Sequence, residues 1–198
     1  MKLPEGDKTF RAYLENKDYQ LKKYNFFRKL FPPDRRACSI DIGAHVGFWT
    51  NYMAKDFEWV HSFEPVSDNY DCLVKNKPDN CTTYKFGLGI QEEKKTLYLG
   101  SRANSGGWSY IKGDREIEET VELRTLDSFD LEPDLIKIDV EGSHMSVLRG
   151  ASETLKKYKP VVIVENEGIE SRRKTGNFLG KLGAGFVSNY GKDCMYTW

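Results

Sequence analysis

The sequence lacks an excess of charge of either sign, and it lacks long apolar runs. Its 198 residues include 30 lysines and arginines and 30 aspartates and glutamates, so the formal net charge at pH 7 is +0. A balanced chain has no overall field that would draw it to nucleic acid or to an anionic membrane. No apolar run approaches the roughly 20 residues of a membrane helix, and residues 1–8 lack the apolar core of a signal peptide. We therefore expect neither a membrane nor a nucleic-acid partner.

Cysteine is also scarce, and its spacing excludes two kinds of site. The four cysteines, at positions 38, 72, 81 and 194, form no Cys-x-x-Cys pair of the kind found in zinc and redox sites. Free thiols in a reducing, cytoplasmic setting are expected rather than disulfides. A chain of this length is that of one domain and buries a full core, so residues 1–198 are predicted to form a single domain.

What the sequence does contain is a strand, turn and helix motif at residues 39–47. Its isoleucines predict a short buried strand, and Gly43 and Gly47 then bracket a tight turn into a helix. A turn without side chains lets a ligand approach the backbone closely. Glu64 lies 21 residues after Gly43 and follows a second apolar run. That is where a doubly wound α/β fold places the carboxylate that binds a ribose diol, so the motif indicates a nucleoside-bearing cofactor.

The same pattern repeats along the chain. Near-continuous apolar strands suit a parallel sheet covered on both faces, and we expect such strands at residues 39–42, 60–63, 82–86, 135–139 and 161–165. Residues 96–99 and 120–123 instead alternate like an antiparallel pair, joined by a loop over residues 100–113 that is rich in glycine, serine and asparagine. A long loop inside a compact domain is usually functional or disordered.

The two ends of the chain differ from this core. Apolar residues recur at helical spacing before Pro32-Pro33, so residues 1–37 are predicted to form a helical cap that precedes a Rossmann-like core over residues 38–198. At the other end, two strand-like segments flank Gly191-Lys192-Asp193 and predict an antiparallel hairpin.

The glycine spacing argues against a dinucleotide site. Such a site prefers Gly-x-Gly-x-x-Gly, whose middle glycine admits the pyrophosphate, whereas Ala44 and His45 fill that space here. The turn still suits a cofactor without pyrophosphate, such as S-adenosylmethionine. Together with the closing hairpin, this favours an α/β, class I methyltransferase fold with a mostly parallel, doubly wound sheet, and it ranks an NAD-dependent oxidoreductase last.

One further segment carries a specific resemblance. The sequence Leu135-Ile-Lys-Ile-Asp-Val-Glu-Gly142, continued by Val-Leu-Arg-Gly-Ala at 147–151, resembles the signature of the FkbM family of S-adenosylmethionine-dependent methyltransferases. Supporting pieces are Asp-Ile-Gly-Ala at 41–44, Gly-Leu-Gly at 87–89 and Thr-Leu-Asp at 125–127, together with Phe-Glu-Pro at 63–65. The resemblance implies a class I methyltransferase fold and O-methylation of a hydroxyl on a sugar or natural product. This chain departs from the family pattern at His45, where asparagine is usual, and at His144, where a second glutamate is usual.

The residues expected to bind the cofactor lie at the first strand ends. Asp41 and the Gly43 backbone are assigned to its methionine part, and Glu64 to its ribose hydroxyls. The remaining cofactor-binding candidates line the turn and the adenine side: Ala44, His45, Gly47, Pro65, Phe86, Gly87, Leu88 and Asp139.

Four residues are candidates for the chemistry. Asp139 and Glu141 are two apart at a strand end, so both can face the cleft, and close carboxylates oppose simultaneous ionisation. Lys137 shares a face with Asp139 and is expected to form an ion pair, either with Asp139 or with an acid on a neighbouring strand. His144 can remove a hydroxyl proton or help to hold a divalent metal, although no metal is expected. A plain helix-start acid at Glu141 and a plain surface histidine remain open alternatives.

The acceptor is expected at the polar loop. Arg102, Asn104 and Trp108 offer a guanidinium, an amide and a ring, a mixture that suits a sugar, and Glu165 is assigned to the acceptor as well. The sequence therefore predicts an O-methyltransferase acting on a small, carbohydrate-containing acceptor. An RNA ribose methyltransferase and a non-catalytic S-adenosylmethionine-binding module remain the alternatives, and the oligomeric state stays open.

Overall fold

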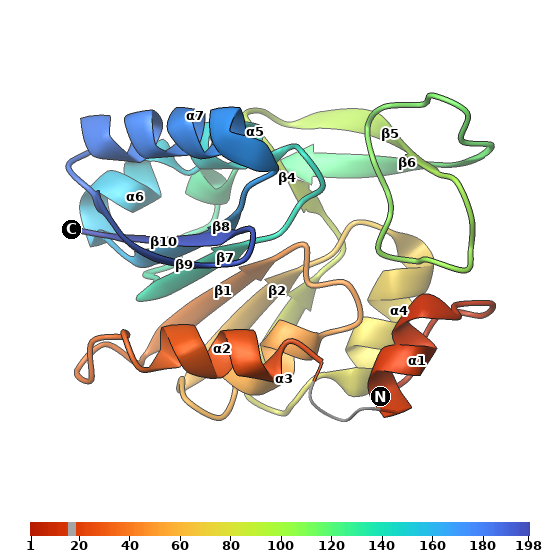
Figure 1. Ribbon diagram of the computed structural model, residues 1–198, viewed down its shortest axis with the longest axis horizontal. Coiled ribbons are helices and arrows are strands. Elements are labelled where there is room, and N and C mark those ends of the chain that lie inside the picture. Colours follow the sequence, from red (N-terminus) through yellow and green to blue (C-terminus); the bar gives the residue numbers. More distant parts are fainter. Residues whose placement is uncertain (16–18) are drawn as a thin grey trace.

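The computed structural model describes residues 1–15 and 19–198, and a seven-stranded sheet forms the centre of this described part (Figure 1). Its strand order is β3-β2-β1-β7-β8-β10-β9. The first five strands are parallel, while β10 runs antiparallel to both β8 and β9. The strands are β1 (Cys38–Ile42), β2 (Trp59–Phe63), β3 (Cys81–Tyr84), β7 (Leu135–Ile138), β8 (Val161–Glu165), β9 (Gly185–Tyr190) and β10 (Asp193–Thr197). The predicted parallel sheet and closing hairpin are therefore confirmed.

Helices cover both faces of this sheet (Figure 1). One face carries α1 (Thr9–Glu15), α2 (Leu21–Arg28), α3 (Phe48–Met53) and α4 (Ser67–Asn76). The other face carries α5 (His144–Arg149), α6 (Ser152–Tyr158) and α7 (Gly168–Lys181), preceded along the chain by the short 3-10 turn Leu126–Ser128. The N-terminal helices predicted before Pro32-Pro33 are thus present as α1 and α2.

Alternate residues of each strand fill two separate cores, as a sheet covered on both faces requires. On β7, Ile136 and Ile138 face the core beneath α5, α6 and α7. Leu135 faces the opposite core, where Phe27 of α2 and Met53 of α3 are fully buried. Apolar residues at nearly every strand position produced the continuous runs seen in the sequence.

A smaller sheet extends from one end of the molecule (Figure 1). It contains β4 (Gly87–Leu88), β5 (Glu93–Leu99) and β6 (Ile117–Arg124) in the order β4-β6-β5. The antiparallel pair predicted around residues 96–99 and 120–123 is β5 with β6. The loop that joins these two strands reaches toward α1 and α4 (Figure 1).

Three predicted element boundaries were wrong. The third strand ends at Tyr84 rather than at Phe86, because the chain turns there into the smaller sheet and the Phe86 ring lies 3.8 Å beneath the Arg124 guanidinium. Asp139 follows β7 instead of ending it. Asp193 is the first residue of β10 rather than part of the hairpin turn, and its side chain is buried.

The four cysteines are free thiols, as their spacing predicted. Among the helices of the described residues, none has the length and apolar character needed to cross a bilayer.

Candidate functional site

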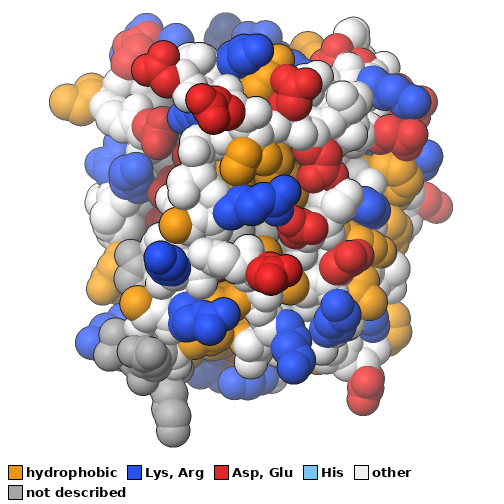
Figure 2. All heavy atoms as spheres, turned by 90° about the vertical axis from the view of Figure 1, so that its right-hand side faces the viewer, with side chains coloured by type: hydrophobic (Ala, Val, Ile, Leu, Met, Phe, Trp, Pro, Cys, Tyr) orange, Lys and Arg blue, Asp and Glu red, His pale blue; other side chains and the backbone are white. Residues whose placement is uncertain are grey.

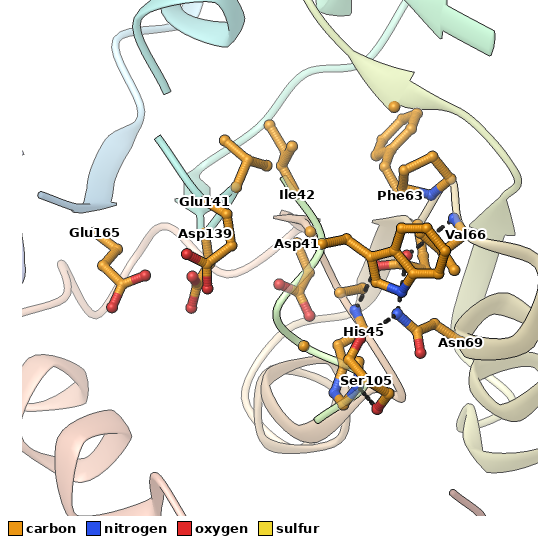
Figure 3. Close-up of a pocket in the computed structure, with 18 of the residues that line it drawn as sticks. Asp41, Ile42, His45, Phe63, Val66, Asn69, Ser105, Asp139, Glu141 and Glu165 are labelled. Carbon is orange, nitrogen blue, oxygen red and sulfur yellow. Dashed lines mark hydrogen bonds between the residues drawn. The ribbon is translucent and has the colours of Figure 1, made fainter. Parts of the chain in front are cut away.

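A cavity of about 220 Å³ lies at the carboxyl ends of β1, β2, β7 and β8. Four carboxylates reach it from four different strand ends: Asp41, Glu64, Asp139 and Glu165. Figure 3 labels Asp41, Asp139 and Glu165 among them. The edge where parallel strands end is the usual ligand position in such sheets. We call these four strand-end acids the floor of the cavity.

The turn after β1 is held by its glycines and by β2. Gly43 has a φ of +78°, and the N–H groups of Gly43 and Ala44 both donate to the Phe63 carbonyl at 3.0 Å. A Cβ at Gly43 would lie 1.9 Å from the Asp139 carbonyl oxygen. The bare backbone is therefore needed so that the β1 turn can pack against the end of β7. Gly47, with a φ of +95°, starts α3 and lies outside the cavity lining.

Glu64 sits in a backbone cradle at the end of β2 and is only 5% exposed. The His45 N–H donates to one carboxylate oxygen at 2.9 Å and the Val66 N–H to the other at 3.0 Å (Figure 3). Burial raises the pKa of Glu64 to about 7, although these hydrogen bonds favour the charged form. The carboxylate is thus fixed in place while its remaining lone pairs stay available to a ligand.

Asn69 was not predicted from the sequence, yet it lines the same part of the cavity. Its Nδ2 donates to the Ser105 carbonyl at 3.0 Å. Its buried Oδ1 finds no hydrogen-bond donor within residues 1–15 and 19–198. A buried acceptor without a donor is costly, so this oxygen is suited to accept a hydrogen bond from a ligand.

Asp41 is buried on β1 and is held by the Thr50 hydroxyl, which donates to it at 2.7 Å. Burial raises the pKa of Asp41 to about 6. This residue lines the cavity as predicted.

Asp139, Glu141 and Glu165 form the acidic end of the cavity (Figure 3). Asp139 and Glu165 are close enough for their charges to affect each other. Burial and this neighbour raise the pKa of Glu165 to about 8. Burial opposes ionisation of Asp139, but the Lys137 ammonium, the neighbouring Glu165 and Lys23 together outweigh it and hold the pKa of Asp139 well below its usual range. Burial raises the pKa of Glu141 as well, and the charge of Asp139 adds to this effect.

Lys137 lies beneath this acidic end and is fully buried. Its Nζ is 3.0 Å from Asp139 Oδ2, which is one of the ion pairs that the sequence suggested. Its second partner is Asp193 of β10, whose Oδ1 lies 3.1 Å from the ammonium. No sequence pattern indicates this pairing, because Asp193 follows a glycine turn far along the chain.

Ser105 is the centre of the opposite wall of the cavity (Figure 3). Its N–H donates to Asp7 Oδ2 at 2.9 Å, and its hydroxyl contacts both Asp7 and the His45 Nε2. The Phe10 ring packs on the His45 ring at a centroid distance of 4.3 Å. Burial lowers the pKa of His45 to about 4, so the ring is neutral at physiological pH. The wall is completed by Trp108 and Tyr110.

We call this second wall the roof, and define it as Asp7, Phe10, Ser105, Trp108 and Tyr110. Residues 1–15 meet the loop between β5 and β6 there: the N–H groups of Lys8 and Thr9 donate to the Ala103 carbonyl at 3.1 and 3.0 Å. Asp7 and Ser105 are separated by 98 residues, so no local sequence pattern signals this contact.

The predicted site residues divide into two groups. The cavity is lined by Asp41, Gly43, Ala44, His45, Glu64, Pro65, Gly87, Leu88, Trp108, Asp139, Glu141 and Glu165. Gly47, Phe86, Arg102, Asn104, Lys137 and His144 lie outside that lining.

Three of these excluded side chains have other contacts. Arg102 is exposed and pairs with Asp68 on the surface at 2.8 Å. The exposed Asn104 accepts a hydrogen bond from the Gly106 N–H of its own turn. His144 begins α5 and its Nε2 lies 3.1 Å from the Ser171 hydroxyl of α7. Its ring therefore points away from Glu141, because the helix begins only after that residue.

Within the described ranges, no group of three or more His, Cys, Asp or Glu side chains is arranged to hold a metal ion.

Comparison with known proteins places this geometry in a family. A family model described as the methyltransferase FkbM domain matches residues 41–188. The hexuronic acid methyltransferase AglP of Haloferax volcanii is 22% identical over 145 residues, which are 68% of this chain and 58% of that protein.

Solved structures show the fold. The FkbM methyltransferase of Methylobacillus flagellatus superposes with a TM-score of 0.60 at 20% identity, over 85% of this chain and 44% of that one. A second structure is described as a putative S-adenosylmethionine-dependent methyltransferase from Listeria monocytogenes. It superposes with a TM-score of 0.52 at 8% identity, over 88% of this chain and 96% of that one. The chain has the class I methyltransferase fold, and it spans about half the length of AglP and of the Methylobacillus flagellatus protein.

Proposed function

The chain belongs to the FkbM family of methyltransferases, and from that premise we propose that it transfers a methyl group from S-adenosylmethionine to a hydroxyl of a small, sugar-containing acceptor. One observation carries the proposal. Four carboxylates meet in a single cavity at the ends of four parallel strands, where this fold class binds its ligands. Two of them, Asp139 and Glu165, lie close together in the cavity lining, where a carboxylate can exchange a proton with an acceptor.

The cavity residues fit the cofactor. Asn69 Oδ1 is a buried acceptor that has no donor among the described residues, and Glu64 has lone pairs directed at the same cavity. We assign Glu64 and Asn69 to the hydroxyls and amino group of an adenosine, and Asp41 to the ammonium of its methionine part. When bound, S-adenosylmethionine supplies the methyl group as an electrophile. The protein then has to orient the acceptor oxygen and remove its proton.

The aromatic roof supports a sugar as the acceptor. Trp108 and Tyr110 present rings to the cavity, and such rings pack on the apolar face of a sugar while carboxylates bind its hydroxyls. The AglP relative is described as a hexuronic acid methyltransferase, which is consistent with an acceptor of this class. We assign Trp108, Glu141 and Glu165 to the acceptor.

The surface next to the cavity gives no support for an RNA acceptor. On the face shown in Figure 2, lysine and arginine side chains are interspersed with aspartates and glutamates and form no continuous basic stripe. Binding of a polynucleotide usually requires such a stripe.

We also propose that residues 1–37 act as a cap within a single domain. Phe10, Tyr19 and Gln20 line the cavity together with the strand ends. At about 220 Å³ the cavity is smaller than the roughly 300–1,000 Å³ of typical ligand pockets. The roof therefore has to move outward when a cofactor and an acceptor enter together.

A labelled-methyl assay tests the proposal. The purified chain is incubated with S-adenosylmethionine carrying a labelled methyl group and with a panel of nucleotide sugars, uronic acids and glycans. We expect label to appear in at least one sugar, and to disappear in Asp139→Ala. Calorimetric titration with S-adenosylhomocysteine checks cofactor binding separately. Binding without transfer to any acceptor would instead favour a non-catalytic module, and salt-sensitive transfer to RNA would favour an RNA enzyme.

A further inference from the structure

A chain of four alternating charges runs from helix α2 to the floor of the cavity. Lys23 Nζ lies 2.5 Å from Asp193 Oδ2, Asp193 Oδ1 lies 3.1 Å from Lys137 Nζ, and Lys137 Nζ lies 3.0 Å from Asp139 Oδ2. The side chains of Asp193 and Lys137 are 0% exposed, while Lys23 is 18% and Asp139 25% exposed. Only the two ends of this chain therefore meet solvent or the cavity.

Asp193 is the member of this chain with no part in the predicted site. Apart from the two ammonium groups, no described residue donates a hydrogen bond to either of its carboxylate oxygens. Burying a carboxylate with two cations is weak evidence for stability, since well-packed apolar residues often serve as well. A role in setting the charge at the cavity floor accounts for the arrangement.

The reacting end of the chain is the Asp139 and Glu165 pair. Both carboxylates line the same end of the cavity (Figure 3), and two close carboxylates oppose simultaneous ionisation, so the neighbouring charges decide which of them holds a proton. Lys137 and Lys23 favour the charged form of Asp139. Asp193 and Asp139 disfavour the charged form of Glu165, and Lys137 favours it.

Three other charged groups face this pair: Asp41 on β1 is close to Asp139, Glu141 follows β7, and Lys192 precedes β10. The uncharged Trp49 ring of α3 lies 5.2 Å from the Lys137 ammonium. None of these bridges Asp139 and β10 as Lys137 does.

We propose that Asp193 is a positioning residue for methyl transfer: it holds the Lys137 ammonium beneath Asp139, so that Asp139 stays ionised and Glu165 receives the proton of the acceptor hydroxyl. This inference rests on the proposed function. In the step, the acceptor O–H bond breaks and its oxygen bonds to the methyl carbon. The methyl carbon–sulfur bond of the sulfonium donor breaks, and its electron pair stays on sulfur. The proton passes to Glu165 in its ionised form, which becomes the major form only above its raised pKa of about 8.

The alternative is that Asp193 merely anchors β10 to α2. Loss of an anchor would lower stability in every variant without changing the proton affinity of Glu165 in a particular direction. The charge chain instead predicts opposite directions. Removing the negative charge of Asp193 eases ionisation of Glu165, whereas removing the positive charge of Lys137 hinders it.

The experiment measures the titration of Glu165 directly. The full chain is labelled with 13C at the glutamate side-chain carboxyl, and the Glu165 signal is assigned as the one missing in Glu165→Gln. The midpoint is then measured in the wild type, Asp193→Asn and Lys137→Met, with the exposed Asp79→Asn as a matched control. We expect Asp193→Asn to lower the midpoint by roughly one unit, Lys137→Met to raise it by a similar amount, and Asp79→Asn to leave it unchanged. An unchanged midpoint in Asp193→Asn, or shifts of the same sign in both variants, would overturn the inference.

Two further measurements keep the inference testable. If Asp193→Asn does not fold, Lys23→Met replaces it, since Lys23 is partly exposed on α2, and its loss should raise the midpoint by less than Lys137→Met does. With an active acceptor, the acid limb of the rate profile should follow the titration midpoint from variant to variant. If methyl transfer occurs but the acid limb of its rate profile does not shift with that midpoint, the inference is wrong and the proposed function still holds. Absence of transfer by the wild type would overturn the function while the titration still reports on Asp193.

Discussion

The floor and the roof of the cavity are built in different ways. Each floor acid stands at the end of a strand of one parallel sheet, and Glu64 is additionally held by two backbone N–H groups. The roof is made of two segments far apart in the sequence, which meet through the Asp7 contacts with Ser105 and through the Lys8 and Thr9 N–H groups on the Ala103 carbonyl. The positions of the floor groups are thus fixed by the sheet, whereas those of the roof depend on contacts that can break singly.

This difference separates two roles. Groups that bind and react require a fixed position, and a sheet edge supplies it. Groups that admit and release ligands have to move, and a wall held by few polar contacts can open at small cost. The predictions below test whether floor substitutions reduce affinity and stability while roof substitutions change mainly the rate of exchange.

The largest effect is expected at Glu64. In Glu64→Ala, the affinity for S-adenosylhomocysteine should fall roughly 100-fold or more, because hydrogen bonds to a charged group contribute about 1.5–3 kcal/mol each. Calorimetric titration measures this loss. The matched control is Glu58→Ala, an exposed acid just before the other end of the same strand, which should bind as the wild type does. If Glu64→Ala bound S-adenosylhomocysteine as tightly as the wild type does, the assignment of Glu64 to the ribose hydroxyls would be wrong.

The next effect concerns the backbone of the floor. Gly43→Ala combines a φ of +78° with a Cβ that would meet the Asp139 carbonyl oxygen at 1.9 Å. We expect a loss of at least about 2 kcal/mol in the free energy of unfolding, and a melting temperature lower by about 4–8 °C. Gly142→Ala is the control, since Gly142 has a φ of +79° but nothing within 4 Å of its Cβ. If both variants lost the same free energy of unfolding, the close contact of Gly43 with the end of β7 would contribute nothing to the destabilisation.

Much of the floor could be predicted from the sequence, because its residues stand at fixed offsets in strand and turn patterns. Asp41, Glu64 and Asp139 end or follow apolar runs, and parallel strands bring such ends to one edge. Asn69 was missed although it lies in the first turn of the helix after Glu64, a position where a polar side chain can point back at the site.

The roof could not be predicted in the same way. Trp108 of the polar loop lines the cavity, and its contact with the acceptor stays a prediction, while Arg102 and Asn104 of the same loop turn to the surface. Composition indicates that a loop is suited to bind, but which side chains face inward depends on its contact with residues 1–15. Likewise, the Lys137 partner Asp193 was missed since burial across a hairpin leaves no local pattern.

The pH dependence of stability should also belong to the floor. Burial raises the pKa of Asp41 to about 6 and of Glu64 to about 7, so the folded state holds these protons more tightly than the unfolded state. Their contribution to the free energy of unfolding is complete below their pKa values in the unfolded state, near 4. It is lost as the pH rises through their pKa values in the folded state. Urea unfolding should therefore give a free energy lower at about pH 8 than at about pH 5, by on the order of 4 kcal/mol. Asp41→Asn should reduce this difference and Asp79→Asn should not; a difference unaltered by Asp41→Asn would place its origin elsewhere.

The smallest effect is expected at the roof. Ser105→Ala removes the hydroxyl that contacts Asp7 and His45 but leaves the backbone bonds of the loop in place. The affinity for S-adenosylhomocysteine should fall by less than about tenfold, mainly through a faster dissociation rate, since interface changes act mostly on release. Stopped-flow displacement measures this rate directly. Ser101→Ala is the matched control, because Ser101 is exposed at the start of the same loop and its hydroxyl contacts only the Ala103 N–H among the hydrogen bonds described. If Ser105→Ala lost as much affinity as Glu64→Ala, the roof would be as much a part of the binding surface as the floor, and the separation of the two roles would fail.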